Sequence, residues 1–226
     1  MTLKVPFLSD AQLESAAQEL LRRYAKWKGE PPRPPIPVDA IAEGVLGLTL
    51  EMNDLRKKLG KSDVLGATWL DDALVVIDSS LEGNEGRYSF TLGHELGHWQ
   101  LHRPLREMDK VTFPLFSREP GEKAGPAIVC RDGQRDPAEI QADKFSAFLL
   151  MPASDVRAAV KQVTGEPLAI DNLAARKKAG DRIAELRDFA AEVIAKGGFS
   201  NVSNQAMQIR LEALKLVVDG AQGRLF

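Results

Sequence analysis

The segment His94-Glu95-Leu96-Gly97-His98 constrains the fold more than any other part of this sequence, because it sets two histidines four residues apart among apolar residues. On an α-helix four residues advance by about 400° and 6 Å, so the two imidazoles leave the same face one turn apart. The surrounding apolar spacing predicts a helix over residues 89–101 that crosses a core; the apolar residues are Phe90, Leu92, Leu96, Trp99 and Leu101. The chain must therefore fold so that a largely buried helix presents both histidines on one side.

Two imidazoles at this spacing can bind one metal ion at about 2.0–2.1 Å. Glu95 follows His94 directly, so it can lie beside the metal without binding it and act as the base for a water that the metal holds. The alternative is a surface helix that merely carries polar residues. The apolar flanks disfavour that alternative, and so does the position of all three histidines of the chain (His94, His98 and His102) on this one segment.

A catalytic zinc site needs a third protein ligand, and two residues come into question. His102 lies eight residues after His94, which on a helix is a rise of about 12 Å, so one ion cannot join them unless the helix breaks. Glu139 lies near the start of a helix that Asp136 caps, and Asp143, one turn later, could orient a ligating imidazole. However, Glu139 also occupies the position of a capping-box glutamate, and the residues alone leave both interpretations open.

Two stretches carry a family resemblance. The sequence H-E-L-G-H-W-Q-L-H at residues 94–102 is followed by E-I-Q-A-D-K-F-S-A-F-L-L-M-P at residues 139–152. Together they resemble the ImmA/IrrE family of metallo-endopeptidases, which has a similar H-E-L-G-H-x-x-L-H and then E-x-x-A-[ND]-x-F-A-x-x-L-L-M-P. The lead-in at residues 88–92 is also similar, and the resemblance extends over about residues 36–152. The chain departs from the family at Ser146, where alanine is usual, and in the long segment before Asp136.

This resemblance implies a compact gluzincin-like fold with a zinc ion bound by His94, His98 and Glu139, and with Glu95 as catalytic base. One Zn²⁺ per chain is expected, with another divalent metal such as Mn²⁺ as an alternative. Family members cleave or engage helix-turn-helix repressors or antitoxins, often under stress, so a protein of that class is the expected substrate.

A second group should stabilise the oxyanion that forms when the peptide carbonyl is attacked. Three residues are candidates for that role or for contacts with the substrate: Tyr88, His102 and Arg131. The strand expected at residues 65–70 could present an edge on which an extended substrate lies as an added strand.

The predicted fold class is α+β, with a zincin-like metallopeptidase domain over residues 1–160 and a helical C-terminal region over residues 161–226. The first part contains an N-terminal helix, a proline-rich connector at residues 30–37 and a hairpin formed by strands 65–70 and 74–77. The second part contains helices at residues 182–196 and 203–218, and residues 198–214 resemble the helix-turn-helix-like segment that often follows the protease domain.

Composition limits the other functions that come into question. The net charge of −2 excludes a generally basic nucleic-acid-binding chain, and the predicted helix 203–218 has only Arg210 and Lys215 as positive residues. A DNA-binding factor and a non-catalytic regulator that binds a repressor remain the alternatives to the protease. One cysteine favours a reducing compartment, and neither a signal peptide nor an apolar run of about 18 residues is evident, so we expect a cytoplasmic protein without a membrane span.

Overall fold

The computed structural model describes residues 5–60, 64–105, 128–131 and 136–220, with the side chains of 128–131 left out. The chain is α+β, as predicted, and it separates into two compact units. The first unit comprises Met1–Pro32 and Pro37–Leu149, and the second comprises Arg33–Ile36 and Leu150–Phe226. The domain boundary predicted after residue 160 falls inside a helix of the second unit, α7 (Ala153–Val163), and stays a prediction.

The first unit contains a four-stranded mixed sheet in the order β1-β3-β2-β4. The strands are β1 (Thr49–Asn53), β2 (Val64–Trp69), β3 (Leu74–Asp78) and β4 (Ile128–Arg131). The predicted β2–β3 hairpin is confirmed as an antiparallel pair, while β1 runs parallel to β3. All six residues of β2 are buried. The expectation that this strand presents a free edge is wrong, because β4 pairs with its other side and therefore forms the edge of the sheet.

Several helical elements come before the sheet in the chain or lie next to its strands. The predicted N-terminal helix is α1 (Asp10–Lys28), which begins with a capping box between Ser9 and Gln12 and ends at Gly29 with a φ of 89°. After the proline-rich connector the chain forms α2 (Val38–Ala40) and then a π-helical turn, η1 (Ile41–Val45). Two short elements flank the hairpin, α3 (Leu55–Leu59) and η2 (Ser79–Leu81).

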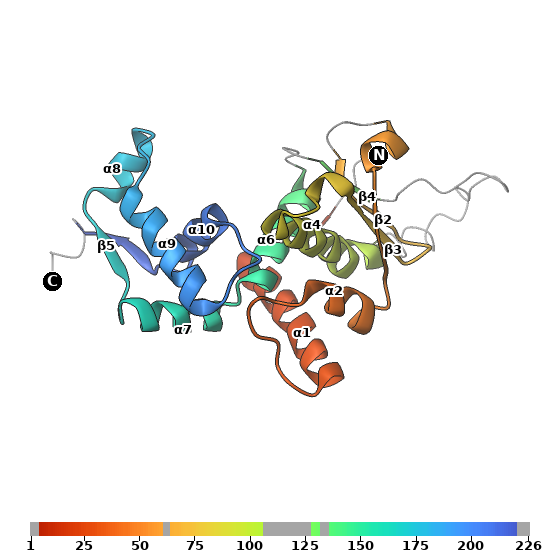
Figure 1. The fold of residues 1–226 in the computed structure, drawn as a ribbon, viewed down its shortest axis with the longest axis horizontal. Coiled ribbons are helices and arrows are strands. Elements are labelled where there is room, and N and C mark those ends of the chain that lie inside the picture. Colours follow the sequence, from red (N-terminus) through yellow and green to blue (C-terminus); the bar gives the residue numbers. More distant parts are fainter. Residues whose placement is uncertain (1–4, 61–63, 106–127, 132–135, 221–226) are drawn as a thin grey trace. The chain divides into compact units, whose positions relative to one another are not determined.

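The histidine-bearing helix α4 (Glu85–Gly97) packs against β2 and β3 (Figure 1). It begins four residues before the predicted start, because the side chain of Asn84 caps it by accepting a hydrogen bond from the backbone N–H of Arg87 at 3.2 Å. It continues into a π-helical turn, η3 (His98–His102), so the helical segment extends to the third histidine.

Helix α6 (Pro137–Leu150) lies close to α4 because two glycines of α4 leave room for it. A Cβ on Gly97 would come within 3.0 Å of the Ala142 Cα, and a Cβ on Gly93 within 2.5 Å of the Ser146 Oγ. The Ser146 hydroxyl donates to the Phe90 carbonyl at 2.8 Å and fixes the two helices to each other. Because the two helices are this close, the side chains of Glu139 and Asp143 on α6 can reach His94 on α4.

The second unit contains α7, β5 (Leu168–Ile170), α8 (Leu173–Lys178), α9 (Ala184–Gly197), α10 (Asn204–Ala213) and β6 (Val217–Asp219). The predicted break at Gly197-Gly198 is present, and Ser203 caps α10 as expected. However, α10 ends at Ala213 and not at residue 218, because Lys215 has a φ of 56° and the chain then pairs in parallel with β5. Part of the proline-rich connector belongs to this unit: Ile36 is buried, and its carbonyl accepts a hydrogen bond from Asn201.

Within the part of the chain that the structure describes, no helix combines the length and the apolar character needed to cross a membrane.

Candidate metal centre

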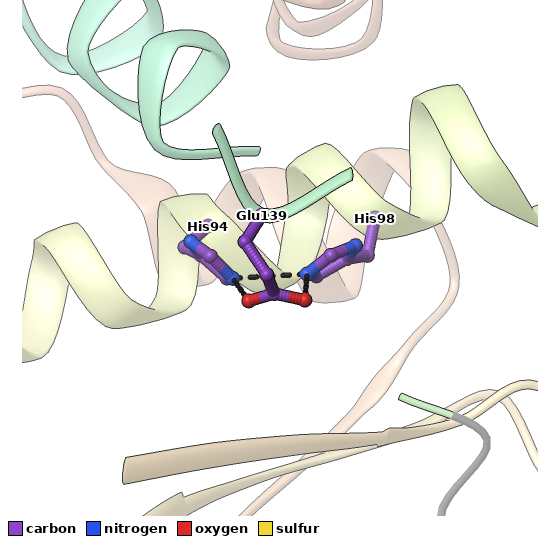
Figure 2. A group of neighbouring side chains, drawn as sticks. All are labelled: His94, His98 and Glu139. Carbon is purple, nitrogen blue, oxygen red and sulfur yellow. Dashed lines mark hydrogen bonds and ion pairs between the residues drawn. The ribbon is translucent and has the colours of Figure 1, made fainter. Parts of the chain in front are cut away.

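Two histidines and a glutamate converge in the first unit. His94 and His98 lie on the same side of the α4–η3 segment, and their Nε2 atoms are 2.9 Å apart (Figure 2). Glu139, in the first turn of α6, points its carboxylate at both rings, with Oε2 at 3.2 Å from His94 Nε2 and Oε1 at 3.3 Å from His98 Nε2. All three side chains are buried, and they form a group that could hold a metal ion. The carboxylate of Glu139 thus faces the histidines, as expected for a ligand.

Hydrogen bonds on the far side of each ring determine which nitrogen faces the centre. His94 Nδ1 lies 2.7 Å from Asp143 Oδ1, and a carboxylate can only accept a hydrogen bond, so this nitrogen carries a proton. His98 Nδ1 lies 2.8 Å from His102 Nδ1. When the Nδ1 atoms carry the protons, each neutral ring turns an Nε2 lone pair toward the centre, which is the form that binds a metal.

The ionisation of these groups also favours a cation. Burial lowers the pKa of His98 to about 4, against the opposing effect of Glu139, so this imidazole is neutral near pH 7. Burial alone would raise the pKa of Glu139, but the facing His94 and His98 outweigh it and lower the pKa to about 2. The centre therefore combines neutral imidazole with an ionised carboxylate.

The spacing of these atoms fits a small divalent ion. Glu139 Oε2 makes no hydrogen bond with any described residue, despite its 3.2 Å contact with His94 Nε2. Two ligand atoms of a tetrahedral zinc lie about 3.3 Å apart when each is about 2.0–2.1 Å from the metal. The nitrogen–oxygen distances of 3.2 and 3.3 Å match that value, and the nitrogen–nitrogen distance of 2.9 Å is somewhat shorter.

Glu95 lies beside this group, on the side of α4 that faces the sheet. It is fully buried, and its Oε2 accepts a hydrogen bond of 2.5 Å from the Thr68 hydroxyl on β2. Gly66, on the same face of that strand, leaves space for the other oxygen, because a Cβ there would come within 2.7 Å of Glu95 Oε1. That Oε1 atom has no hydrogen-bond partner among the described residues. Burial raises the pKa of Glu95 to about 7, although His94 and the Thr68 hydrogen bond act in the opposite direction.

The remaining predicted site residues have other surroundings. Tyr88 donates a hydrogen bond of 2.5 Å to Asp39, and burial together with this carboxylate raises its pKa. His102 is fully buried, and both of its ring nitrogens face protein atoms, Nδ1 that of His98 and Nε2 the side-chain oxygen of Gln141. Neither ring nitrogen of His102 is therefore available to stabilise an oxyanion or to contact a substrate. Arg131 ends β4, and its side chain is outside the described residues.

Sequence reasoning missed three residues of the site. Gly66 and Thr68 are two residues apart on a strand, so they share a face, and a small and a polar residue at that spacing in an apolar strand could have pointed to a buried polar neighbour. Gln141 is a buried polar residue of α6, and its partner His102 is far from it in the chain, so no local pattern indicates the pair.

No family model matches this chain, and no curated protein matches it. The chemistry of the site must therefore be inferred from the arrangement of its own residues. Two imidazoles and a carboxylate are a donor set that suits zinc, and a buried carboxylate next to them can accept a proton.

Proposed function

We propose that this protein is a zinc-dependent endopeptidase of the ImmA/IrrE kind, with a zincin-like first unit. The observation that carries the proposal is that His94 Nε2, His98 Nε2 and the Glu139 carboxylate, three groups that suit zinc, face one another inside the protein. When each imidazole carries its proton on Nδ1, all three groups are hydrogen-bond acceptors, and a divalent cation between them removes their mutual repulsion.

His94, His98 and Glu139 would hold the ion. When bound, it would supply a Lewis acid that polarises the scissile carbonyl and lowers the pKa of a water. Two histidines and a glutamate form the ligand set of a well-known class of catalytic zinc sites, which supports zinc over Mn²⁺ as the occupant. Asp143 keeps His94 in the required tautomer through its hydrogen bond of 2.7 Å.

Glu95 acts as the general base in this proposal and later as the general acid. It takes a proton from the attacking water and passes the proton to the amine that leaves when the peptide bond breaks. Burial raises the pKa of Glu95 in the metal-free centre, and a buried carboxylate beside the proposed ligands can take up and release a proton. The Thr68 hydroxyl fixes one carboxylate oxygen and leaves Oε1 as the oxygen that exchanges the proton.

The proposed substrate is a helix-turn-helix repressor or an antitoxin, and this part rests on the family resemblance of the sequence. A non-catalytic regulator would need the metal ligands as a brace but would not need Glu95. A DNA-binding role for the second unit is less well supported. Arg210, one of the two basic residues of the segment 203–218, is buried and donates a hydrogen bond to the Met151 carbonyl. Its guanidinium is therefore not available for DNA phosphates.

The substitution Glu95→Gln tests the proposal, because glutamine keeps the size of the side chain but cannot accept the proton. We expect the variant to bind one zinc per chain, as the wild type does, and to lose at least a hundredfold in the cleavage rate of a repressor encoded beside this gene. Elemental analysis and a gel-based cleavage assay measure the two properties. The matched control is Glu85→Gln, an exposed glutamate of the same helix, which should cleave at the wild-type rate.

Undiminished cleavage by Glu95→Gln would remove Glu95 from the mechanism. A wild type that binds zinc and binds the repressor without cleaving it would support the regulator instead.

A further inference from the structure

We infer that His102 and Gln141 are positioning residues, which hold the Nε2 atom of His98 toward the metal through a chain of hydrogen bonds that ends on the Pro6 carbonyl. The inference rests on the proposed function, because it takes His98 as a metal ligand. It assigns the third histidine a role that is neither ligand nor contact with the substrate.

The chain of hydrogen bonds has three links. His98 Nδ1 and His102 Nδ1 are 2.8 Å apart, His102 Nε2 and Gln141 Oε1 are 3.0 Å apart, and Gln141 Nε2 is 2.7 Å from the carbonyl oxygen of Pro6. His98, His102 and Gln141 are all buried. A buried polar group that lacks its hydrogen-bond partner destabilises the fold, so every link has to be made with the correct donor and acceptor.

The carbonyl of Pro6 fixes the direction of all the links, because a carbonyl oxygen can only accept. Gln141 must turn its NH₂ group toward Pro6, so its Oε1 faces His102 and requires a proton on His102 Nε2. A neutral histidine with a proton on Nε2 has a lone pair on Nδ1, and this lone pair requires a proton on the Nδ1 atom of His98. His98 then has its free lone pair on Nε2, the atom that faces His94 and Glu139.

The two proposed histidine ligands are therefore supported in different ways. The Nδ1 atom of His94 donates to Asp143, a carboxylate whose side chain is 52% exposed. That of His98 donates to a neutral, buried chain which reaches across α6 to the segment before α1. Partners of this kind fix the orientation and the tautomer of a ligating imidazole, and their loss typically weakens metal binding 10- to 100-fold.

Metal affinity tests the inference in the full-length protein. His102→Leu removes both links of the ring, whereas His102→Gln can restore them, since an amide oxygen can accept from His98 and an amide NH₂ group can donate to Gln141. We expect His102→Leu and Gln141→Leu to bind Zn²⁺ 10- to 100-fold more weakly in competition with a chromophoric chelator, and His102→Gln to stay within about threefold of the wild type. The visible absorption bands of bound Co²⁺ should change in the two leucine variants and not in His102→Gln.

Ser146→Ala is the matched control, because it breaks a different hydrogen bond between α4 and α6, the one to the Phe90 carbonyl. It should lower the unfolding temperature of the metal-free protein without changing the zinc affinity or the Co²⁺ spectrum. The inference would be overturned if His102→Leu and Gln141→Leu fold and keep the wild-type zinc affinity and Co²⁺ spectrum. It would also be overturned if His102→Gln binds zinc as weakly as His102→Leu does.

A measurement on the wild type does not depend on how the variants fold. Long-range ¹H–¹⁵N NMR spectra of the histidine side chains at pH 7.5 report which ring nitrogen carries the proton. We expect the proton of His102 on Nε2 and that of His98 on Nδ1, and the opposite tautomer of His102 would overturn the inference. A wild type that binds neither Zn²⁺ nor Co²⁺ would refute this inference and the proposed function together. A wild type that binds metal but cleaves no repressor would refute the endopeptidase alone.

Discussion

At the scale of single residues, Glu95 is a carboxylate that is costly to bury. It accepts a hydrogen bond from Thr68, and burial raises its pKa from 4.5 to about 7. Such a change corresponds to on the order of 3 kcal/mol of unfavourable free energy for the ionised form. A group that destabilises the fold when it is charged is expected at a functional position and not at a structural one.

The cost of burying the ionised Glu95 predicts how the stability of the metal-free protein depends on pH. Between pH 4.5 and about 7 the folded state holds a proton on Glu95 that the unfolded chain releases, so this residue makes the fold less stable as the pH rises. Glu95→Gln lacks this effect. We expect the variant to match the wild type near pH 4.5 and to be more stable by about 3 kcal/mol at pH 8.

Urea unfolding in the presence of a chelator, at a series of pH values, measures the difference in the free energy of unfolding. Titrating groups that do not interact with Glu95 cancel in this difference. Ser146→Ala, which removes no ionisable group, should show a difference that does not change with pH. A constant difference for Glu95→Gln would contradict the burial of an ionisable group at this position.

Single residues also differ in how far the sequence could predict them. The pairing of His94 with His98 follows from the period of the helix, which is a local property. Glu139 was ambiguous because a ligand and a capping-box residue have the same position relative to Asp136, and only the contact with two residues more than forty positions earlier favours the ligand. Thr68 and Gln141 have partners on other elements, and a single sequence gives no direct information on such contacts.

At the scale of elements, the site depends on how closely α6 approaches α4. The two helices meet at Gly93 and Gly97, opposite Ser146 and Ala142. In most helices the exchange of an interior glycine for alanine stabilises the protein by roughly 0.5–1 kcal/mol. At Gly93 the added methyl group would lie only 2.5 Å from the Ser146 hydroxyl oxygen, so here the sign should be reversed.

We predict that Gly93→Ala destabilises the metal-free protein by about 1–3 kcal/mol, the usual cost of overpacking. Ser146→Ala alone should cost about 1 kcal/mol through the lost hydrogen bond to Phe90. The double variant should be more stable than Gly93→Ala, because it removes the hydroxyl that the new methyl group would strike. A double-mutant cycle from urea unfolding measures the coupling. If the destabilisations by Gly93→Ala and Ser146→Ala simply add in the double variant, the two helices can move apart freely at this point.

The ends of the elements show the limit of prediction from the sequence. The start of α10 agrees with the helix predicted from residue 203, because Ser203 is a local capping signal, and Ser9 and Gly29 are signals of the same kind at the ends of α1. The end of α10 was missed because β6 forms only by pairing with β5, a strand almost fifty residues earlier. The strand β4 was not predicted at all, for the same reason, since its partner β2 lies far from it in the chain.

At the scale of the whole molecule, the proposed ligands all belong to the first unit, and they join two helices that are distant in sequence. Metal binding should therefore stabilise that unit in particular. Free Zn²⁺ at a hundred times its Kd stabilises the folded form by about 2.7 kcal/mol, which slows exchange through unfolding roughly a hundredfold.

Hydrogen exchange followed by mass spectrometry tests this expectation. On addition of a chelator, peptides from α4 and α6 should exchange roughly a hundredfold faster, while peptides from α9 and α10 serve as the internal control and should be unchanged. No acceleration in either unit would contradict a metal site in the first unit, and an equal acceleration in both would show that the two units unfold together.

The hydrogen bond between Gln141 and Pro6 has a consequence for any shortened version of this chain. A polypeptide that started at Ser9 would keep the capping box of α1 and every side chain of the site. It would nevertheless lack the carbonyl oxygen of Pro6, which holds the NH₂ group of Gln141 and so fixes the orientation of this amide. The Gln141 amide could then rotate by half a turn, and the rings of His102 and His98 could adopt the opposite tautomers. A truncation of eight residues would thus loosen the imidazole of His98, about ninety positions away.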